Sequence, residues 1–143
     1  MLKILGIGNS YTIDPMHLLG EIYKAESPDQ QIQLGFLYYG GCALNQHVQF
    51  IRDDAANYTY YKLNNETGKW VTTANSTAAD ALEDEAWDIV TLQQSSANSG
   101  KPETYNADIQ TIQKYVSDTL GYTPEFLWNM TWAYPRAITI PTM

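Results

Sequence analysis

A short run near the start of the sequence, Gly8-Asn9-Ser10-Tyr11-Thr12, places a serine where it could do chemistry. The apolar segment over residues 2–8 predicts a buried strand, and Asp14 is the expected N-cap of a helix over residues 15–25. A serine at the carboxyl end of the first strand of an α/β sheet lies where such sheets hold ligands and catalytic groups. Ser10 is therefore a candidate nucleophile, and the alternative is that it caps the following helix.

Two other polar stretches also follow predicted strands. Gly40-Gly41 ends a strand over residues 32–39, and Gln93-Gln94 follows a strand over residues 88–92. Each pair has a structural explanation as well as a functional one. The glycines suit a turn that needs a positive φ angle, and the two glutamine amides could stabilise a turn.

The elements that must position these residues alternate along the chain. Further helices are predicted over residues 44–55, 76–85 and 105–120, and a further strand over residues 126–130. This alternation predicts a parallel sheet with helices on both faces, a three-layer α/β/α fold in one domain over residues 1–143. Residues 58–73 predict an antiparallel β-hairpin, inserted at the surface.

Composition limits the classes of function. The chain has 143 residues, 44% of them hydrophobic, and a net charge of −8, which argues against nucleic acid and anionic membranes as partners. No apolar run is long enough to span a membrane. No cluster of histidine, cysteine and carboxylate has the spacing of metal ligands, so we expect no metal or other cofactor. The single cysteine, Cys42, is expected to be a small buried side chain rather than a nucleophile.

Taken in order, three blocks resemble those of the SGNH (GDSL-type) hydrolases, serine esterases with a flavodoxin-like three-layer fold. Residues 8–12 resemble the nucleophile block, with Gly-Asn-Ser instead of Gly-Asp-Ser, as in one bacterial branch of the family. Residues 39–44 resemble the second block and residues 87–96 the third, and residues 128–134 are also similar to that branch. The resemblance implies the order 2-1-3-4 for the four core strands, together with a fifth strand that this sequence does not provide.

The resemblance also implies roles for individual residues. Ser10 is the nucleophile, and the backbone N–H of Gly41 and the side-chain amide of Gln94 stabilise the oxyanion. Gln94 stands where the family has an asparagine. In comparable enzymes one such donor contributes about 3 kcal/mol. The implied substrate is a small acyl ester, such as an acetyl ester of a carbohydrate, cleaved through an acyl-enzyme.

The sequence departs from the family in one respect, because it contains no Asp-x-x-His block to supply the general base. We therefore expect a domain that is incomplete at its C-terminus, and whether this chain is itself an enzyme stays open. Its two histidines are His17, expected on the surface or in packing, and His47, one helical turn after the Gly41 loop. For His47 a structural or substrate-contacting role is favoured over that of a replacement base. The expected residues around the substrate cleft are Asn9, His47, Gln93 and Trp132.

Two other functions remain in competition with the esterase. The same fold without its base could bind a glycan or a protein through the aromatic residues of the hairpin, which are Tyr58, Tyr60, Tyr61 and Trp70. A second copy of the chain could cover an exposed edge of the sheet.

No signal peptide is visible, so the compartment is the cytoplasm for the chain as written, or the periplasm or exterior if a leader has been removed.

Overall fold

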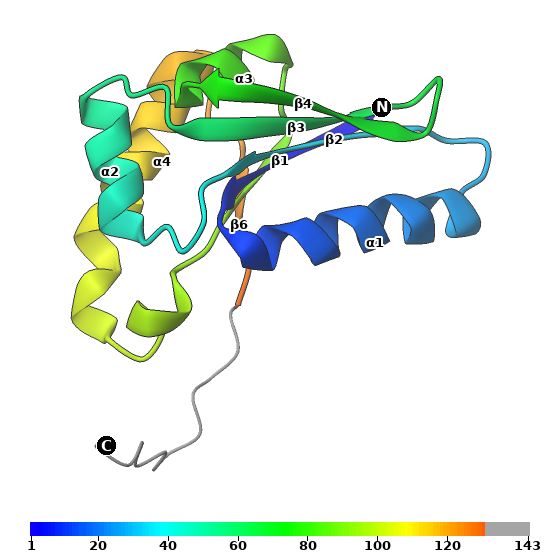
Figure 1. Cartoon of the computed structure of the whole chain (residues 1–143). Coiled ribbons are helices and arrows are strands. Elements are labelled where there is room, and N and C mark those ends of the chain that lie inside the picture. The colour runs from blue at the N-terminus through cyan, green and yellow to red at the C-terminus, as the bar shows by residue number, and fades with distance from the viewer. Residues whose placement is uncertain (131–143) are drawn as a thin grey trace.

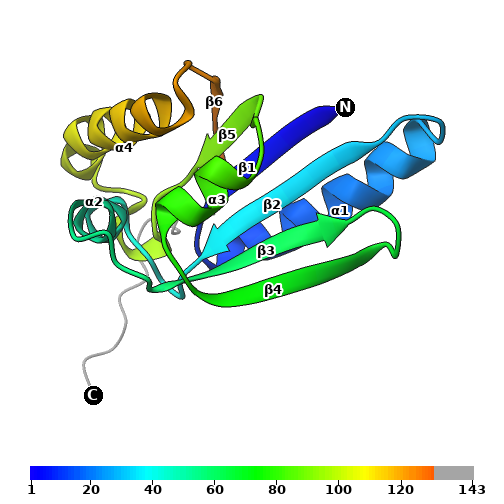
Figure 2. The ribbon, with the colours of Figure 1, turned by 90° about the horizontal axis from the view of Figure 1, so that it is seen from above.

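A six-stranded mixed sheet forms the centre of the computed structural model, which describes residues 1–130 (Figures 1 and 2). The strands follow one another across the sheet in the order β4-β3-β2-β1-β5-β6. They are β1 (Leu2–Gly8), β2 (Ile32–Tyr38), β3 (Tyr58–Asn64), β4 (Lys69–Ser76), β5 (Ile89–Leu92) and β6 (Glu125–Trp128). The helices are α1 (Ser10–Glu26), α2 (Leu44–Arg52), α3 (Ala78–Asp84) and α4 (Asn106–Leu120), with short 3-10 turns η1 (Ser96–Asn98) and η2 (Pro102–Thr104).

The four core strands are parallel and confirm the predicted order 2-1-3-4, since they run β2-β1-β5-β6 across the sheet. Their register aligns the carboxyl ends. Gly8 pairs with Tyr38, Ile7 with Leu92, and Leu92 with Trp128. The loops that follow β1, β2, β5 and β6 therefore leave the sheet side by side at one edge.

Helices cover both faces of the sheet, which confirms the three-layer architecture (Figure 1). Successive strand residues point to opposite faces, so Ile4 packs on the α1 side while Leu5 packs beneath the other three helices. Phe36 and Leu37 divide in the same way. No helix within residues 1–130 combines the length and the apolar character needed to cross a membrane.

The hairpin differs from the predicted surface insertion, because β3 pairs antiparallel with β2 and extends the central sheet. Polar contacts hold it against the end of α3. The Tyr60 hydroxyl and the Lys62 amine donate to Asp84 at 2.9 Å and 2.8 Å, and Lys62 also pairs with Glu85 at 2.9 Å. In the described part of the chain β4 and β6 are the outermost strands of the sheet. Self-association through either of these edge strands stays a prediction.

Helix α1 begins five residues before the predicted start at Pro15, and its N-cap is Asn9 rather than Asp14. The Asn9 side chain accepts a hydrogen bond from the Tyr11 N–H at 3.1 Å. Pro15 lies inside the helix and has no N–H to donate to the Tyr11 carbonyl, four residues earlier. The Asn129 side-chain nitrogen lies 3.5 Å from that carbonyl and takes the place of the missing donor.

Candidate active site

Ser10 is the first residue of α1 and is exposed at the edge where the parallel strands end. Its hydroxyl makes no hydrogen bond to any other group within residues 1–130. The N-terminus of a 17-residue helix carries a partial positive charge and unpaired N–H groups, which stabilise negative charge nearby. The position therefore suits a hydroxyl that becomes an alkoxide during a reaction.

Asn9 ties the turn that carries Ser10 to the loop after β2. It is buried, and its side-chain nitrogen donates to the Cys42 carbonyl at 3.0 Å. Its Oδ1 accepts from the Tyr11 N–H and from the Gln93 side-chain amide. One side chain thus caps the helix and fixes the distance between the Ser10 turn and the Gly41 turn.

Gly41 lies in a tight turn closed by a hydrogen bond from the Cys42 N–H to the Tyr39 carbonyl, at 3.1 Å. Its φ angle is +66°, which favours glycine, and no atom lies within 4 Å of the position that a Cβ would take. Backbone conformation rather than crowding therefore requires glycine here. No acceptor in the described residues takes the Gly41 N–H, which leaves this donor free for a ligand.

A buried amide network supports Asn9 from below. Gln93 donates to Asn9, and its Oε1 accepts from the Thr12 hydroxyl at 2.6 Å and from the Asn129 amide at 2.8 Å. Gly8 leaves the space in which these groups meet, since a Cβ there would overlap Thr12 Oγ1 and lie 2.8 Å from Gln93 Cδ. The network joins β1, α1, β5 and the end of β6 directly behind the exposed serine.

Gln94 is buried and makes its hydrogen bonds away from Ser10. Its Oε1 accepts from the Leu44 N–H at 3.0 Å and from the Ser95 N–H at 2.9 Å. Its nitrogen donates to the Thr104 carbonyl at 3.2 Å and the Thr104 hydroxyl at 3.1 Å. The amide holds the N-terminus of α2 just behind the Gly41 turn. Its predicted role as an oxyanion donor would require it to leave Thr104.

His47 differs from the expectation that it faces the substrate cleft, because it is fully buried on α2. Its ring stacks on Tyr58, with Nδ1 2.6 Å from the tyrosine hydroxyl. Nε2 has no hydrogen-bond partner within the described residues. Burial lowers the pKa of His47 to about 4, so the ring is neutral near pH 7. Contact with a substrate would require the core to open.

Cys42 is buried, as predicted, and its chemistry agrees with that position. Burial raises the pKa of the thiol to about 12, so the thiolate that a nucleophile needs is scarce at neutral pH. Ser10 is therefore a better candidate nucleophile than Cys42, to whose backbone carbonyl Asn9 donates a hydrogen bond.

A family model described as "Domain of unknown function (DUF4886)" matches residues 3–139. The chain belongs to the DUF4886 family. A crystal structure of a DUF4886 protein from Bacteroides uniformis ATCC 8492 is similar to it, with a TM-score of 0.80 and 34% identity. That similarity covers 93% of this DUF4886 chain and 51% of the other. No curated protein matches the sequence significantly.

A second solved structure is similar to the chain in fold. A protein of Slackia heliotrinireducens, described as "a putative SGNH hydrolase", matches with a TM-score of 0.50 and 19% identity. The match covers 87% of this chain and 54% of that one. At this identity the comparison shows a shared fold. The DUF4886 chain spans about half the length of both solved proteins.

Sequence reasoning missed two residues of this DUF4886 site, Thr12 and Asn129. Asn129 directly follows the strand that lies next to β5, so its position after a core strand was the available signal. Thr12 gave no signal before the start of α1 was known.

Trp132, expected beside the cleft, lies outside the described residues. Within residues 1–130 no three or more histidines, cysteines and carboxylates gather in a group that could hold a metal ion.

Proposed function

We propose that this DUF4886 chain supplies the nucleophile and the oxyanion donors of an SGNH-type serine esterase. Its substrates are small acyl esters, with acetyl esters of carbohydrates as the class we favour. One observation carries the proposal. The Asn9 side chain bonds both to the Tyr11 N–H and to the Cys42 carbonyl, and so holds the turn with the exposed, unpaired Ser10 hydroxyl beside the turn with the free Gly41 N–H. A fixed nucleophile beside fixed donors is the arrangement that acyl transfer needs.

The proposed reaction has two steps. The Ser10 Oγ attacks the ester carbonyl carbon while its proton passes to a general base, and the N–H groups of Ser10 and Gly41 stabilise the oxyanion. The tetrahedral intermediate then expels the alcohol, which takes up the proton, and leaves the acyl group on Ser10. A water molecule, deprotonated by the same base, releases the acid and restores the hydroxyl.

The general base of this proposal is a histidine from outside these 143 residues. His47 is buried against Tyr58, and His17 packs against Trp70, with ring centroids 4.9 Å apart. Residues 131–143 contain no histidine, aspartate or glutamate. Gln94 then acts as a positioning residue, since it holds the N-terminus of α2 behind the donor turn.

The test is intact-mass analysis after treatment with a fluorophosphonate, with and without added imidazole as an external base. We expect a single adduct, increased by imidazole and mapped to Ser10 by peptide analysis. The variant Ser10→Ala should lose it, whereas Ser27→Ala, at the opposite end of α1, should keep it. No adduct under either condition, or one that survives in Ser10→Ala, would contradict the proposal and favour a non-catalytic binding module.

A further inference from the structure

A row of aromatic rings crosses the α1 side of the sheet from β2 to β4. Tyr61 stacks on Phe36 with centroids 4.5 Å apart, and Tyr38 meets Tyr61 edge-on at 6.2 Å. Trp70 lies 5.2 Å from Phe36 and 4.9 Å from the ring of His17. Phe36 is fully buried and forms the base of the row, while the other rings are half-buried and accessible from solvent.

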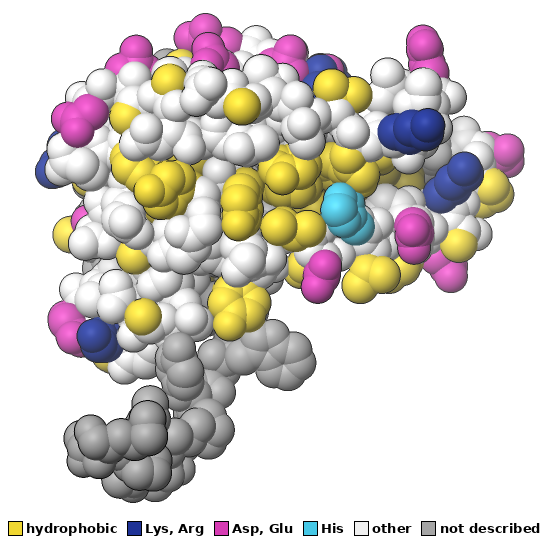
Figure 3. All heavy atoms as spheres, viewed as in Figure 1, with side chains coloured by type: hydrophobic (Ala, Val, Ile, Leu, Met, Phe, Trp, Pro, Cys, Tyr) yellow, Lys and Arg dark blue, Asp and Glu magenta, His cyan; other side chains and the backbone are white. Residues whose placement is uncertain are grey.

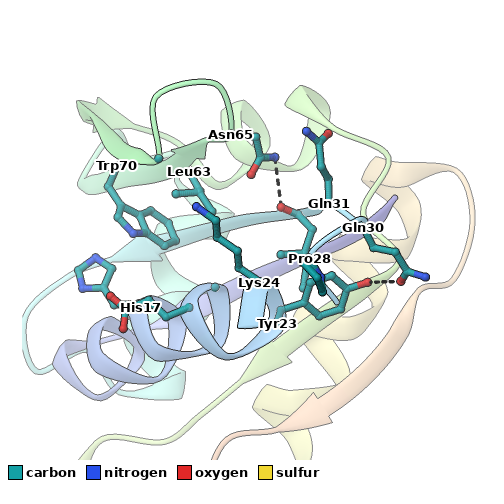
Figure 4. Close-up of a pocket in the computed structure, with 13 residues that line it drawn as sticks. His17, Tyr23, Lys24, Pro28, Gln30, Gln31, Leu63, Asn65 and Trp70 are labelled. Atoms are coloured by element: carbon teal, nitrogen blue, oxygen red, sulfur yellow. Dashed lines mark hydrogen bonds between the residues drawn. The ribbon is translucent and has the colours of Figure 1, made fainter. Parts of the chain in front are cut away.

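Trp70 and His17 line a groove between α1 and the β3–β4 hairpin, and Tyr61 and Tyr38 continue the row beyond it. Figure 3 shows hydrophobic side chains gathered in a band between the two elements, beside a histidine side chain. The groove deepens into a pocket of about 590 Å³. Trp70 and Leu63 of the hairpin face His17 of α1 across it, and Lys24 extends into the space between (Figure 4).

The aromatic row begins next to the candidate active site. Tyr38 is the last residue of β2 and pairs with Gly8, two residues before Ser10. Its hydroxyl lies 3.3 Å from where a Cβ of Gly40 would be, so it is beside the turn that presents the Gly41 N–H. Ile32, at the other end of β2, lines the pocket. The seven residues of β2 span about 23 Å, a length that accommodates several sugar rings.

The lining combines aromatic rings with neutral and oppositely charged polar groups. Glu21 and Lys24 are one turn apart on α1, and Gln31 and Asn65 line the same pocket. The C–H face of a pyranose ring packs on the face of an aromatic ring, while its hydroxyl groups need donors and acceptors at the rim. A fatty acyl chain offers no hydrogen-bonding partner to these polar groups, and the net charge of −8 disfavours polyanions.

We infer that this groove binds a neutral oligosaccharide, the alcohol part of the ester that Ser10 cleaves. The inference rests on the proposed function for the identity of the bond, but binding in the groove does not require turnover. It assigns Trp70, Tyr61 and Tyr38 as stacking platforms. Tyr58 and Tyr60, expected on the same contact surface, are instead buried on the other face of the sheet.

The test uses Ser10→Ala, so that binding is measured without cleavage. Xylohexaose, cellohexaose, chitohexaose and an array of neutral glycans are the probes, with affinities measured by calorimetry. We expect at least one glycan to bind, and Trp70→Ala to weaken it by about tenfold or more. Trp70→Phe, which keeps a ring, should lose less. Val71→Ala, on the other face of the same strand, should stay within about twofold.

The outcomes separate the two proposals. No binding of any neutral glycan, or binding that Trp70→Ala leaves unchanged, would overturn the groove assignment. Trp70→Ala could loosen the hairpin, so Glu21→Ala on the exposed surface of α1 provides a second test. The affinity of this variant for the glycan should also fall. Fluorophosphonate labelling at Ser10 without glycan binding would leave the esterase proposal standing. Glycan binding that depends on Trp70 without labelling would leave the groove standing.

Discussion

The Asn129 side-chain amide donates a 2.8 Å hydrogen bond to Gln93 Oε1, although 36 residues separate the two along the chain. Gln93 in turn donates to Asn9, which precedes the exposed serine. The strand at one edge of the sheet therefore supports the first turn of α1 through two side chains. This relationship gives Asn129 a positioning role that its place in the sequence alone does not reveal.

Replacing Asn129 should weaken the fold without unfolding it. Asn129→Ala leaves the Tyr11 carbonyl without its substitute donor and removes one donor from Gln93 Oε1. We expect the free energy of unfolding to fall by about 1–3 kcal/mol, measured by urea denaturation. Asn57→Ala, at an exposed position, is the control and should change little. Equal stability of the two variants would show that the network does not depend on Asn129.

Gly8 should tolerate no side chain. Gly8→Ala would force a methyl group against Thr12 Oγ1 and Gln93 in a buried network, so we expect a loss of about 3 kcal/mol or failure to fold. Gly100→Ala is the matched control, because nothing lies within 4 Å of its Cβ position. Urea midpoints compare the two, and the prediction is wrong if Gly8→Ala is as stable as the control.

Gly41 and Gly68 separate backbone strain from a role at the site. Both have positive φ angles, +66° and +70°, and both have open space around the Cβ position. Substitution by alanine should therefore cost each about 1 kcal/mol of stability. Only Gly41→Ala should also slow fluorophosphonate labelling of Ser10, by about tenfold, because it shifts a donor N–H. Equal labelling in both variants would remove Gly41 from the proposed machinery.

Stability should fall on mild acidification because of His47. Its pKa is about 4 in the folded chain and about 6.5 when unfolded, so the unfolded state binds the proton first as pH falls. Burial of the neutral His47 ring therefore costs no stability above pH 6.5. As pH drops towards 4, the free energy of unfolding decreases by about 3 kcal/mol on account of this residue. Urea unfolding at several pH values measures the slope. His47→Gln should flatten it and His17→Gln should not; the same slope in both would refute the assignment.

The Cys42 thiol should resist reagents in the native state. Its burial and raised pKa predict slow reaction with Ellman's reagent at pH 8, followed by release of one equivalent in denaturant. The chain has one cysteine, so the absorbance change needs no correction for other thiols. Rapid native labelling would show that the loop after β2 opens readily.

The strands and their alternating faces were predictable because they follow from short-range patterns that the sequence displays directly, whereas the strand order came from the family resemblance. The start of α1 was not, because Pro15 resembles a first-turn residue, whereas the Asn9 cap and the distant Asn129 extend the helix towards the N-terminus. The sequence also does not reveal toward which partner a side-chain amide points. Gln93 and Gln94 are adjacent and chemically identical, and one turns to Asn9 while the other turns to Thr104.

The long sequence separations within this network bear on when the Ser10 turn becomes fixed during synthesis. Asn129 and Tyr11 are 118 residues apart, and the Asn9 cap also needs Gln93, so neither the cap nor its support is complete on a short nascent chain. A partly made chain would display the serine on a turn that is not yet fixed. On this basis, the turn that carries Ser10 should become fixed late in synthesis, when β6 docks beside β5.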